Sequence, residues 1–215
     1  MTEAVFDPSL VEAEPASAAV IFGDRIELAR EFTGQLVARG DELGLIGPRE
    51  LPQLWTRHIL NSALPAPLVN GRVVDVGSGA GLPGIVLAIA RPDVHFTLIE
   101  PMERRTNWLQ SQVDLLELAN VTVVRARGED YEVVEPFDVA TARAVSALRT
   151  LIPLTAPLVR SGGELALLKG ARAAEEIEKA AKAIRKYRLT DVRVEELGHA
   201  EGVEVTRVVR ATVDP

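Results

Sequence analysis

A glycine-rich segment after a run of β-type residues holds the chemistry most suited to binding a ligand. Residues 73–84 read Val-Val-Asp-Val-Gly-Ser-Gly-Ala-Gly-Leu-Pro-Gly, with four glycines among the last eight positions. Glycine lets the backbone turn tightly and approach a ligand because it has no Cβ. A helix that begins after such a turn offers free N–H groups. The segment therefore predicts a strand, a ligand-binding loop and a helix.

Two classes of ligand are compatible with this loop. Residues 79–84 follow the pattern G-x-G-x-x-G, which is the dinucleotide fingerprint. Glu100 lies 21 residues beyond Gly79, near the position of the acid that binds ribose in such proteins. An NAD(P)-dependent oxidoreductase on a Rossmann frame is therefore one hypothesis.

Three details favour S-adenosylmethionine as the cofactor instead. Asp75 lies two residues before Gly77, where a carboxylate would repel a pyrophosphate but attract a cationic amine or sulfonium. Pro83 removes an N–H group from the first helical turn, where a pyrophosphate needs donors. Counted from Asp75, the loop reads D-x-G-x-G-x-G, which is typical of S-adenosylmethionine-dependent methyltransferases. We expect Asp75, Gly77 and Gly79 to bind the cofactor.

Further polar residues follow the other predicted strands. In open α/β sheets, ligands bind at the carboxyl ends of the strands. Glu100 ends the second strand, where its carboxylate can accept hydrogen bonds from both ribose hydroxyls. Gly128 and Glu129 follow the third strand, where the adenine would lie. Arg143 follows the fourth strand, and Lys169 follows the fifth, at the edge of the predicted site.

The absence of certain catalytic motifs from the sequence narrows the choice of atom that accepts the methyl group. Residues 138–144 read Asp-Val-Ala-Thr-Ala-Arg-Ala, without the Asn/Asp-Pro-Pro-aromatic loop used to methylate exocyclic amino groups. The chain has no cysteine to attack C6 of a pyrimidine. A ring nitrogen with a free lone pair, such as guanine N7, needs no general base, and alignment can supply the rate. Elimination thus favours a ring nitrogen.

The elements that must position these residues alternate along the chain. Apolar β-type runs predict strands at Val73–Val76, His95–Ile99, Val121–Arg125, Phe137–Ala142 and Glu164–Leu168. Helical spacing predicts helices at Leu82–Ala90, Glu103–Leu118, Ala147–Leu158 and Ala173–Arg188. Five β–α repeats demand a parallel sheet with helices on both faces. A closing hairpin, Val192–Glu196 and Val203–Ala211, adds two strands and places one antiparallel strand in the sheet.

The region before this sheet has a different pattern. Residues 1–17 are acidic and lack periodicity, which predicts a disordered tail. Residues 18–64 form a predicted helical extension, with helices from Ala18 to about Asp41 and from Pro48 to Leu60. Residues 65–215 form the predicted methyltransferase domain. We predict neither a targeting peptide nor a membrane span, because the start is acidic and no run reaches 18 apolar residues.

Composition excludes several other classes. With 24 Lys and Arg against 31 Asp and Glu, the net charge is −7, so the protein does not coat nucleic acid by bulk charge. Zero cysteines exclude a disulfide scaffold, a cysteine zinc site and a thiolate nucleophile. The absence of cysteine suits a reducing cytoplasm. We predict no metal site.

Several separate segments together resemble one known family. The chain is similar to the bacterial 16S ribosomal RNA guanine-N7 methyltransferases RsmG, also called glucose-inhibited division protein B. The matching pieces are Leu54–Ser62, Asp75–Gly84, Arg104-Arg105, Arg127-Gly128-Glu129, Phe137-Asp138, Ala142-Arg143-Ala144 and Leu168-Lys169-Gly170. They span residues 54–170 in the expected order. Arg104 departs from the Lys-Arg pair expected there, which puts a lysine-specific role in doubt.

The resemblance implies a class I methyltransferase fold that transfers the methyl group of S-adenosylmethionine to guanine N7 in the decoding region of 16S rRNA. It implies cofactor contacts at Gly77, Leu82, Gly128, Glu129 and Arg143. The partner would be 16S rRNA within the small ribosomal subunit or its precursor, met by a monomer in the cytoplasm. Loss of the enzyme would give low-level streptomycin resistance.

Other polar residues in the matched segments have a functional and a structural interpretation. We predict that Arg143 and Lys169 hold RNA and cofactor during catalysis. Candidate RNA contacts are Arg57, His58, Arg104, Arg105 and Lys169. The three arginines among them could instead pair with surface carboxylates. His58 either borders the RNA pocket or serves the core.

Overall fold

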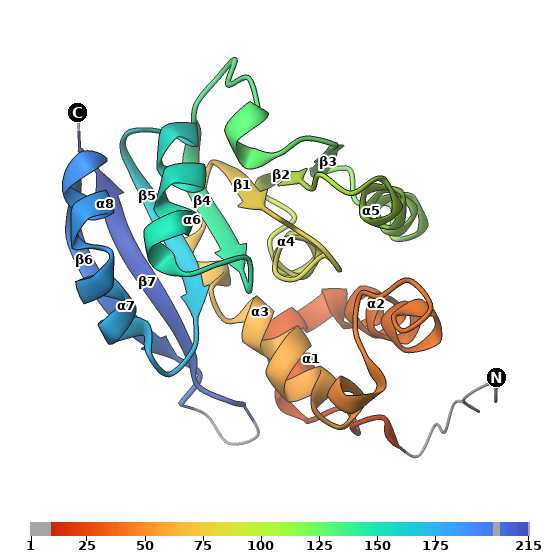
Figure 1. The fold of residues 1–215 in the computed structure, drawn as a ribbon. Helices are drawn as coiled ribbons and strands as arrows, with labels where there is room; N and C mark the ends of the chain where they lie inside the picture. Colours follow the sequence, from red (N-terminus) through yellow and green to blue (C-terminus); the bar gives the residue numbers. More distant parts are fainter. Residues whose placement is uncertain (1–9, 200–202, 215) are drawn as a thin grey trace, which may run out of the picture.

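The computed structural model describes residues 10–199 and 203–214, which form a seven-stranded sheet covered by helices (Figure 1). The strand order is β3-β2-β1-β4-β5-β7-β6. The strands are β1 (Arg72–Val76), β2 (His95–Ile99), β3 (Val121–Val124), β4 (Phe137–Arg143), β5 (Val159–Lys169), β6 (Leu189–Leu197) and β7 (Thr206–Val213). Strands β1 to β5 pair in parallel, whereas β7 runs antiparallel to both neighbours. The predicted mostly parallel sheet is confirmed.

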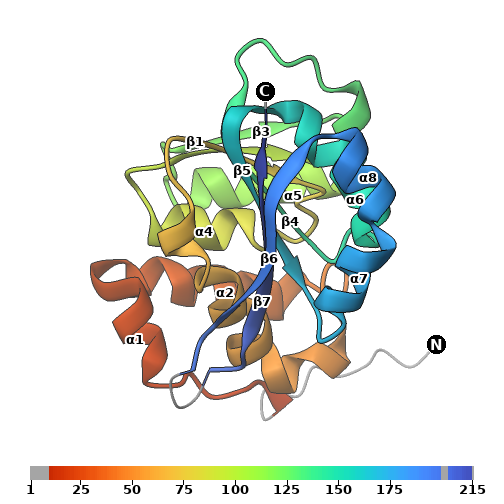
Figure 2. The ribbon, with the colours of Figure 1, turned by 90° about the vertical axis from the view of Figure 1, so that its left-hand side faces the viewer.

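Helices cover both faces of this sheet. They are α1 (Ser17–Phe22), α2 (Ile26–Arg39), α3 (Asn61–Ala63), α4 (Gly84–Ala90), α5 (Glu103–Leu115), α6 (Leu148–Thr155), α7 (Ala173–Lys179) and α8 (Ala181–Lys186). In Figure 2, α1, α2 and α4 lie on one side of the central strands, and α6, α7 and α8 on the other. Adjacent residues of β1 accordingly enter different cores: Val73 packs with α4 and the N-terminal helices, and Val74 packs with α6. Burial on both faces explains the continuous apolar runs.

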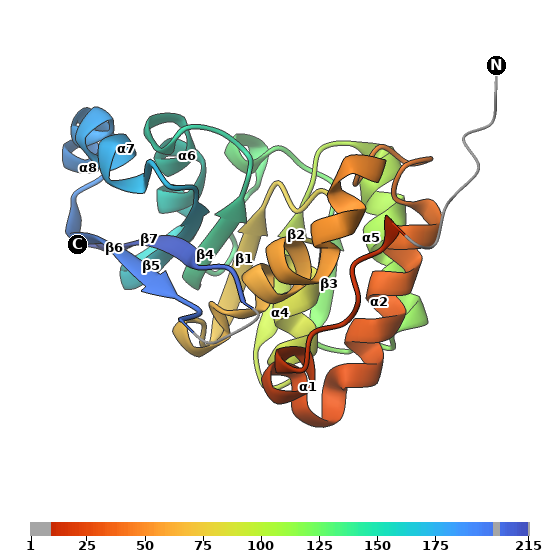
Figure 3. The same ribbon diagram turned by 90° about the horizontal axis from the view of Figure 1, so that it is seen from below.

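The N-terminal helices share one hydrophobic core with α4 and α5. Figure 3, seen from below, shows α1 and α2 beside these helices. The helix predicted from Ala18 to Asp41 is divided, because Gly23 adopts a positive φ of 51° and ends α1. The segment predicted as a helix from Pro48 to Leu60 is a 3₁₀ turn (Pro48–Gln53) followed by a π-helical turn (Leu54–Leu60). π-Helical turns are often found at functional sites.

Part of the predicted disordered tail lies against the body. Residues 1–9 fall outside the described residues. Beyond them, the Thr56 N–H group donates to Glu12 Oε2 at 2.9 Å. The Arg30 guanidinium donates to both carboxylate oxygens of Glu14, at 2.7 and 2.8 Å. Residues 10–17 are therefore tied to the helical region, and two of the acidic residues near the N-terminus are paired with it. The proposed boundary at residue 65 stays a prediction.

The C-terminal elements differ in detail from the sequence prediction. The helix predicted over Ala173–Arg188 tightens at Ala180, whose N–H group is shared between the carbonyls of Glu176 and Ile177, so α7 and α8 are separate. The predicted hairpin is confirmed as the antiparallel pair β6 and β7. None of the helices in the described part of the chain has the length and apolar character needed to cross a membrane.

Candidate functional site

A cavity of about 570 Å³ opens at the carboxyl ends of β1, β2 and β4. The pairing register places Val76 beside Ile99, so the loops that follow these two strands meet at one edge of the sheet. Predicted site residues that line the cavity are His58, Gly77, Gly79, Leu82, Glu100, Arg105, Gly128, Glu129 and Arg143. Predicted residues outside its lining are Arg57, Asp75, Arg104 and Lys169.

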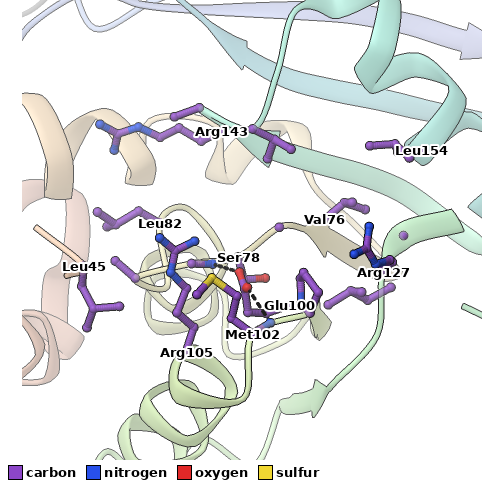
Figure 4. A pocket seen from close by; sticks show the side chains of 18 of the residues that line it. Leu45, Val76, Ser78, Leu82, Glu100, Met102, Arg105, Arg127, Arg143 and Leu154 are labelled. Atoms are coloured by element: carbon purple, nitrogen blue, oxygen red, sulfur yellow. Dashed lines mark hydrogen bonds between the residues drawn. The ribbon is translucent and has the colours of Figure 1, made fainter. Parts of the chain in front are cut away.

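The pocket is built from two parts of the chain (Figure 4). We call the loop 76–84, residues 99–102 and 127–129, and Leu154 the glycine-loop half, because the loop after β1 forms its centre. We call Leu45, Ile46, Glu50, His58 and Arg143 the helical half, because four of these residues precede the sheet. Figure 4 shows Leu45 and Arg143 on one side of the pocket and Val76 and Arg127 on the other.

In the glycine-loop half, the loop amides donate within the protein. The Gly77 N–H group donates to the Ile99 carbonyl oxygen at 2.8 Å. The Gly79 N–H group donates to Glu100 Oε2 at 3.0 Å, and that of Gly84 to Asp75 Oδ2 at 3.0 Å. The sequence predicted that amides at the start of the helix would be free for a ligand. These glycine amides are instead engaged, which leaves the G-x-G-x-x-G segment poorly suited to a pyrophosphate.

Glu100 connects the loop to the end of β2. One carboxylate oxygen accepts from Gly79, and the other accepts from the Met102 N–H group at 3.0 Å. The residue is 2% exposed but lines the cavity. A carboxylate oxygen can accept more than one hydrogen bond. Glu100 is therefore held rigidly at the pocket with acceptor capacity left for a ligand's hydroxyl groups.

Asp75 lies beneath the loop and does not line the cavity. Its Oδ2 accepts from Gly84, while its Oδ1 is buried and has no hydrogen-bond partner among the described residues. Burial raises the pKa of Asp75 to about 7. In this structure the carboxyl of Asp75 supports the loop from outside the pocket lining, and its contact with a cationic ligand stays a prediction. Gly84 is required beside it because a Cβ there would lie 2.6 Å from Asp75 Oδ2.

Apolar side chains form the far end of the glycine-loop half. Val76, Ile99 and Leu154 line the cavity around Gly128. A Cβ at Gly128 would lie 3.0 Å from a Val76 methyl group, so glycine keeps this wall open. Glu129 is exposed at the rim, 3.9 Å from the Arg127 guanidinium. This end of the pocket suits a flat apolar group such as a nucleobase.

Trp108 supports the glycine loop from behind. Its indole N–H group donates to the Ala80 carbonyl oxygen at 3.0 Å, and Ala80 lines the pocket. Its ring also packs near Phe32 of α2, with 6.5 Å between the ring centroids. The second tryptophan, Trp55, is buried in the π-helical turn. Both tryptophans therefore belong to the packing around the pocket.

Arg143 joins the sheet to the helical region. Its guanidinium donates to the carbonyl oxygens of Arg57 and His58, each at 3.0 Å, and to Ser62 Oγ at 2.7 Å. It also donates to His58 Nδ1 at 2.9 Å. Burial lowers the pKa of Arg143 to about 10, which still leaves it protonated at neutral pH. The geometry makes Arg143 a positioning residue that holds the π-helical turn over the end of β4.

His58 is fixed in one tautomer by these contacts. Arginine is a donor only, so Nδ1 of His58 must accept from Arg143. The N–H group is then on Nε2, and it donates to Glu50 Oε2 at 2.7 Å. Burial, together with the charge of Arg143, lowers the pKa of His58. The ring is therefore neutral at physiological pH, and the contact with Glu50 is a hydrogen bond rather than an ion pair.

The remaining predicted basic residues are in three different environments. Arg105 reaches from α5 into the pocket (Figure 4). Arg57 and Arg104 are exposed outside it, and Arg104 lines a separate groove of about 550 Å³ beside α2 and α5. The Lys169 amine donates to the Ser146 carbonyl oxygen at 2.7 Å and pairs with Glu176 at 2.8 Å. With its side chain 8% exposed, Lys169 supports the loop after β4, and its contact with RNA stays a prediction.

Sequence reasoning missed several residues that line the pocket. Glu50 is the most consequential, because it places a carboxylate beside His58. Its position in a 3₁₀ turn gives no periodic signal, and its partner is 8 residues away. Arg127 at the rim belongs to a segment matched by the family resemblance, but it was not predicted as a site residue. Leu45 and Ile46 read as connecting residues after the first helix, yet they form an apolar part of the helical half.

Solved structures of methyltransferases share this arrangement of sheet and helices. TYW2 from M. jannaschii, crystallised with AdoMet, matches with a TM-score of 0.56 and 24% identity, over 72% of this chain and 74% of that one. The tRNA (m1A58) methyltransferase TrmI from Aquifex aeolicus matches with a TM-score of 0.52 and 19% identity, over 73% and 67%. The fold is therefore that of the S-adenosylmethionine-dependent methyltransferases.

Sequence comparison gives the particular family. The family model described as rRNA small subunit methyltransferase G matches residues 25–204. A ribosomal RNA small subunit methyltransferase G from Clavibacter michiganensis is 62% identical over 96% of this chain and 99% of the relative. One from an Arthrobacter species is 53% identical over 95% and 96%. The chain belongs to the rRNA small subunit methyltransferase G family, and the nicotinamide-dependent alternative receives no support.

Proposed function

We propose that this protein transfers the methyl group of S-adenosylmethionine to N7 of a guanine in 16S rRNA. Membership in the rRNA methyltransferase family supports an RNA substrate. The observation that carries the choice of atom is the state of His58. Both of its ring nitrogens are engaged, by Arg143 and by Glu50, so it has no free lone pair with which to act as a base. Guanine N7 is a methyl acceptor that needs no base, because it carries no proton to be removed.

Residues of the glycine-loop half fit this cofactor. Glu100 would accept from the ribose hydroxyls, and Val76, Ile99 and Leu154 would enclose the adenine around Gly128. When bound, the cofactor supplies an electrophilic methyl group: the N7 lone pair forms the new bond, the C–S electron pair stays on sulfur, and no proton leaves. The task of the protein is then alignment and exclusion of water.

The binding partner we propose is the small ribosomal subunit or its precursor, met by a monomer in the cytoplasm. Arg105 and Arg127 at the pocket, with Arg57 and Arg104 outside it, provide candidate contacts for phosphate. The net charge of −7 makes these local cations more important than bulk attraction. We also propose that loss of the enzyme gives low-level streptomycin resistance, as in the family that the sequence resembles.

Two measurements test this function. Thermal-shift screening should show stabilisation by S-adenosylmethionine or its demethylated product, because a ligand that binds only the folded state raises its stability. Incubation with labelled cofactor and unmodified small subunits, followed by nucleoside mass spectrometry, should yield 7-methylguanosine from 16S rRNA. Stabilisation by NAD or NADP alone, or methylation at an exocyclic amine or a carbon atom, would refute the proposal.

A further inference from the structure

The helical half of the pocket contains one carboxylate, that of Glu50, among positively charged neighbours. Its side chain is 42% exposed and lines the cavity that also contains the glycine loop. Arg143 and Arg105 line the same cavity. A partly exposed carboxylate is an unusual choice for a pocket that must accept RNA, because it repels phosphate. It is suited to a group that presents hydrogen-bond donors.

This carboxylate is held in place by a chain of hydrogen bonds. Arg143 donates to His58 Nδ1 at 2.9 Å, which fixes the His58 Nε2–H group toward Glu50 Oε2 at 2.7 Å. One oxygen of Glu50 therefore has a fixed partner. Among the described residues, His58 is the hydrogen-bond partner of this carboxylate, and it contacts Oε2. Oε1 therefore keeps its full capacity to accept hydrogen bonds, and Oε2 keeps part of it. The arrangement pre-organises an anionic acceptor at the pocket.

We propose that Glu50 recognises the target base by accepting hydrogen bonds from N1–H and the N2 amino group of guanine; this rests on the function proposed above. These two donors lie side by side on the Watson–Crick edge, and a carboxylate has two acceptor oxygens to match them. Adenine presents an acceptor at N1 and lacks the N2 amino group, so it cannot make this pair. N7 lies on the opposite side of the base, so an anchor at the Watson–Crick edge leaves N7 free to react.

The same contact would also assist methyl transfer. As N7 gains the methyl group, the purine becomes cationic, and its N1–H and N2 donors become stronger. A hydrogen bond to an anionic acceptor therefore tightens as the reaction proceeds. Interactions that are stronger in the transition state than in the ground state raise the rate of the chemical step. Glu50 would thus serve both selection of guanine and catalysis, without removing a proton.

The experiment combines a substitution in the protein with a substitution of the target base, in the manner of a double-mutant cycle. Glu50→Gln keeps the size of the side chain but turns one acceptor into a donor. Replacing the target guanosine of 16S rRNA by inosine removes only the N2 amino group. Single-turnover methylation is measured for both proteins on both RNAs, assembled into small subunits, and calorimetry gives the affinity for S-adenosylmethionine. Glu42→Gln is the matched control, because Glu42 is exposed and does not line the pocket.

We expect Glu50→Gln to slow methylation of guanosine by about 10- to 100-fold, the range for loss of a hydrogen bond to a charged group. We expect inosine to slow the wild-type protein by about 10-fold and to add little to the effect of Glu50→Gln, because both changes remove the same contact. Cofactor affinity should stay at the wild-type value, and Glu42→Gln should match the wild-type protein throughout.

Three results would overturn the proposal. The first is wild-type activity in Glu50→Gln. The second is that Glu50→Gln and inosine lower the methylation rate independently, so that their fold-losses multiply when combined. The third is equal rates on guanosine and inosine for the wild-type protein, a result that does not depend on whether the variant folds. Failure of the proposed function is distinguishable from these, because the wild-type protein would then place no methyl group on N7 of any guanosine.

Discussion

The two halves of the pocket are built in different ways. The glycine-loop half comes mainly from strand ends and loops between residues 76 and 129, and its key contacts are made by backbone amides, as between Gly79 and Glu100. The helical half depends on side chains that meet across the fold: Arg143 and His58 are 85 residues apart in sequence. A motif can therefore specify the first half locally, whereas the second exists only when the N-terminal helices dock on the sheet.

The strongest test of this contrast is Arg143→Met. The substitution leaves the acceptors on Arg57, His58 and Ser62 without their donor. We expect unfolding free energy to fall by about 3–5 kcal/mol, as when one partner of a buried polar network is removed. Methyl transfer should fall further than cofactor affinity, because the glycine-loop half remains. Urea denaturation and calorimetry measure the two effects.

Arg149→Met is the control for Arg143→Met, because Arg149 is exposed and outside the pocket lining. It should change stability by less than about 0.5 kcal/mol. If Arg143→Met were equally mild, the hydrogen bonds to the π-helical turn would not be what joins the two halves.

Within the glycine-loop half, the largest effect is expected from Gly84→Ala. The added Cβ would lie 2.3 Å from a Leu98 methyl group and 2.6 Å from Asp75 Oδ2. Such overpacking costs about 1–3 kcal/mol of stability, and the displaced loop should bind S-adenosylmethionine more weakly. Gly34→Ala in α2 is the matched control, because its added Cβ would meet no described atom within 4 Å apart from the backbone of its own helix. It should stabilise by about 0.5–1 kcal/mol; similar behaviour of both variants would contradict the close packing at Gly84.

Glu100→Ala tests the carboxylate that joins the loop to β2. We expect cofactor affinity to fall by about 1–3 kcal/mol, the range for losing hydrogen bonds to a charged acceptor. Calorimetry on the folded variant measures this directly. Glu132→Ala provides the comparison, because Glu132 is exposed and not part of the pocket. Unchanged affinity in folded Glu100→Ala would remove Glu100 from the cofactor site.

The smallest effect is expected from pH. Burial and the charge of Arg143 lower the pKa of His58 from its ordinary value of 6.5, so the ring is already neutral above about pH 6.5. Titration of His58 should therefore contribute little to the pH dependence of single-turnover methyl transfer between about pH 6.5 and 8.5. It should lower the rate only at lower pH, where protonation ends the contact from Arg143. A steep rise with an apparent pKa near 6.5, lost in His58→Asn, would show that a general base is used.

The sequence predicts the glycine-loop half better than the helical half for a physical reason. Strand β1, the loop and α4 follow from local signals, namely an apolar run and glycines that permit tight turns. Glu100 follows from its place at the end of the second strand, and the structure brings it to the loop. The engagement of the loop amides could not be read this way, because their acceptors come from β2 and from Asp75.

The sequence did not predict the hydrogen-bond partners of several site residues, because those partners are distant in sequence. Arg143 and Lys169 were predicted to follow the fourth and fifth strands, and the structure makes them the last residues of β4 and β5. A position at a strand end says nothing of a side chain's partners. In the structure, both charged groups donate to backbone carbonyl oxygens, and Lys169 also forms an ion pair with Glu176. Glu50 carries no local signal, because its relation to the pocket arises only from the docking of a 3₁₀ turn. Helical breaks at Gly23 and Ala180 likewise depend on local backbone geometry that periodicity does not capture.

The two tryptophans give each half of the pocket its own intrinsic fluorophore. Trp108 donates to the carbonyl of Ala80 in the glycine loop, and Trp55 lies within the π-helical turn that Arg143 holds. The chain has only these two tryptophans, so a single substitution isolates the emission of either one. With Trp55→Phe, the remaining emission comes from Trp108, beside the glycine loop and Phe32 of α2. With Trp108→Phe, it comes from Trp55 in the π-helical turn. Changes at the glycine loop and at the π-helical turn can thus be followed through separate fluorophores, without an attached dye.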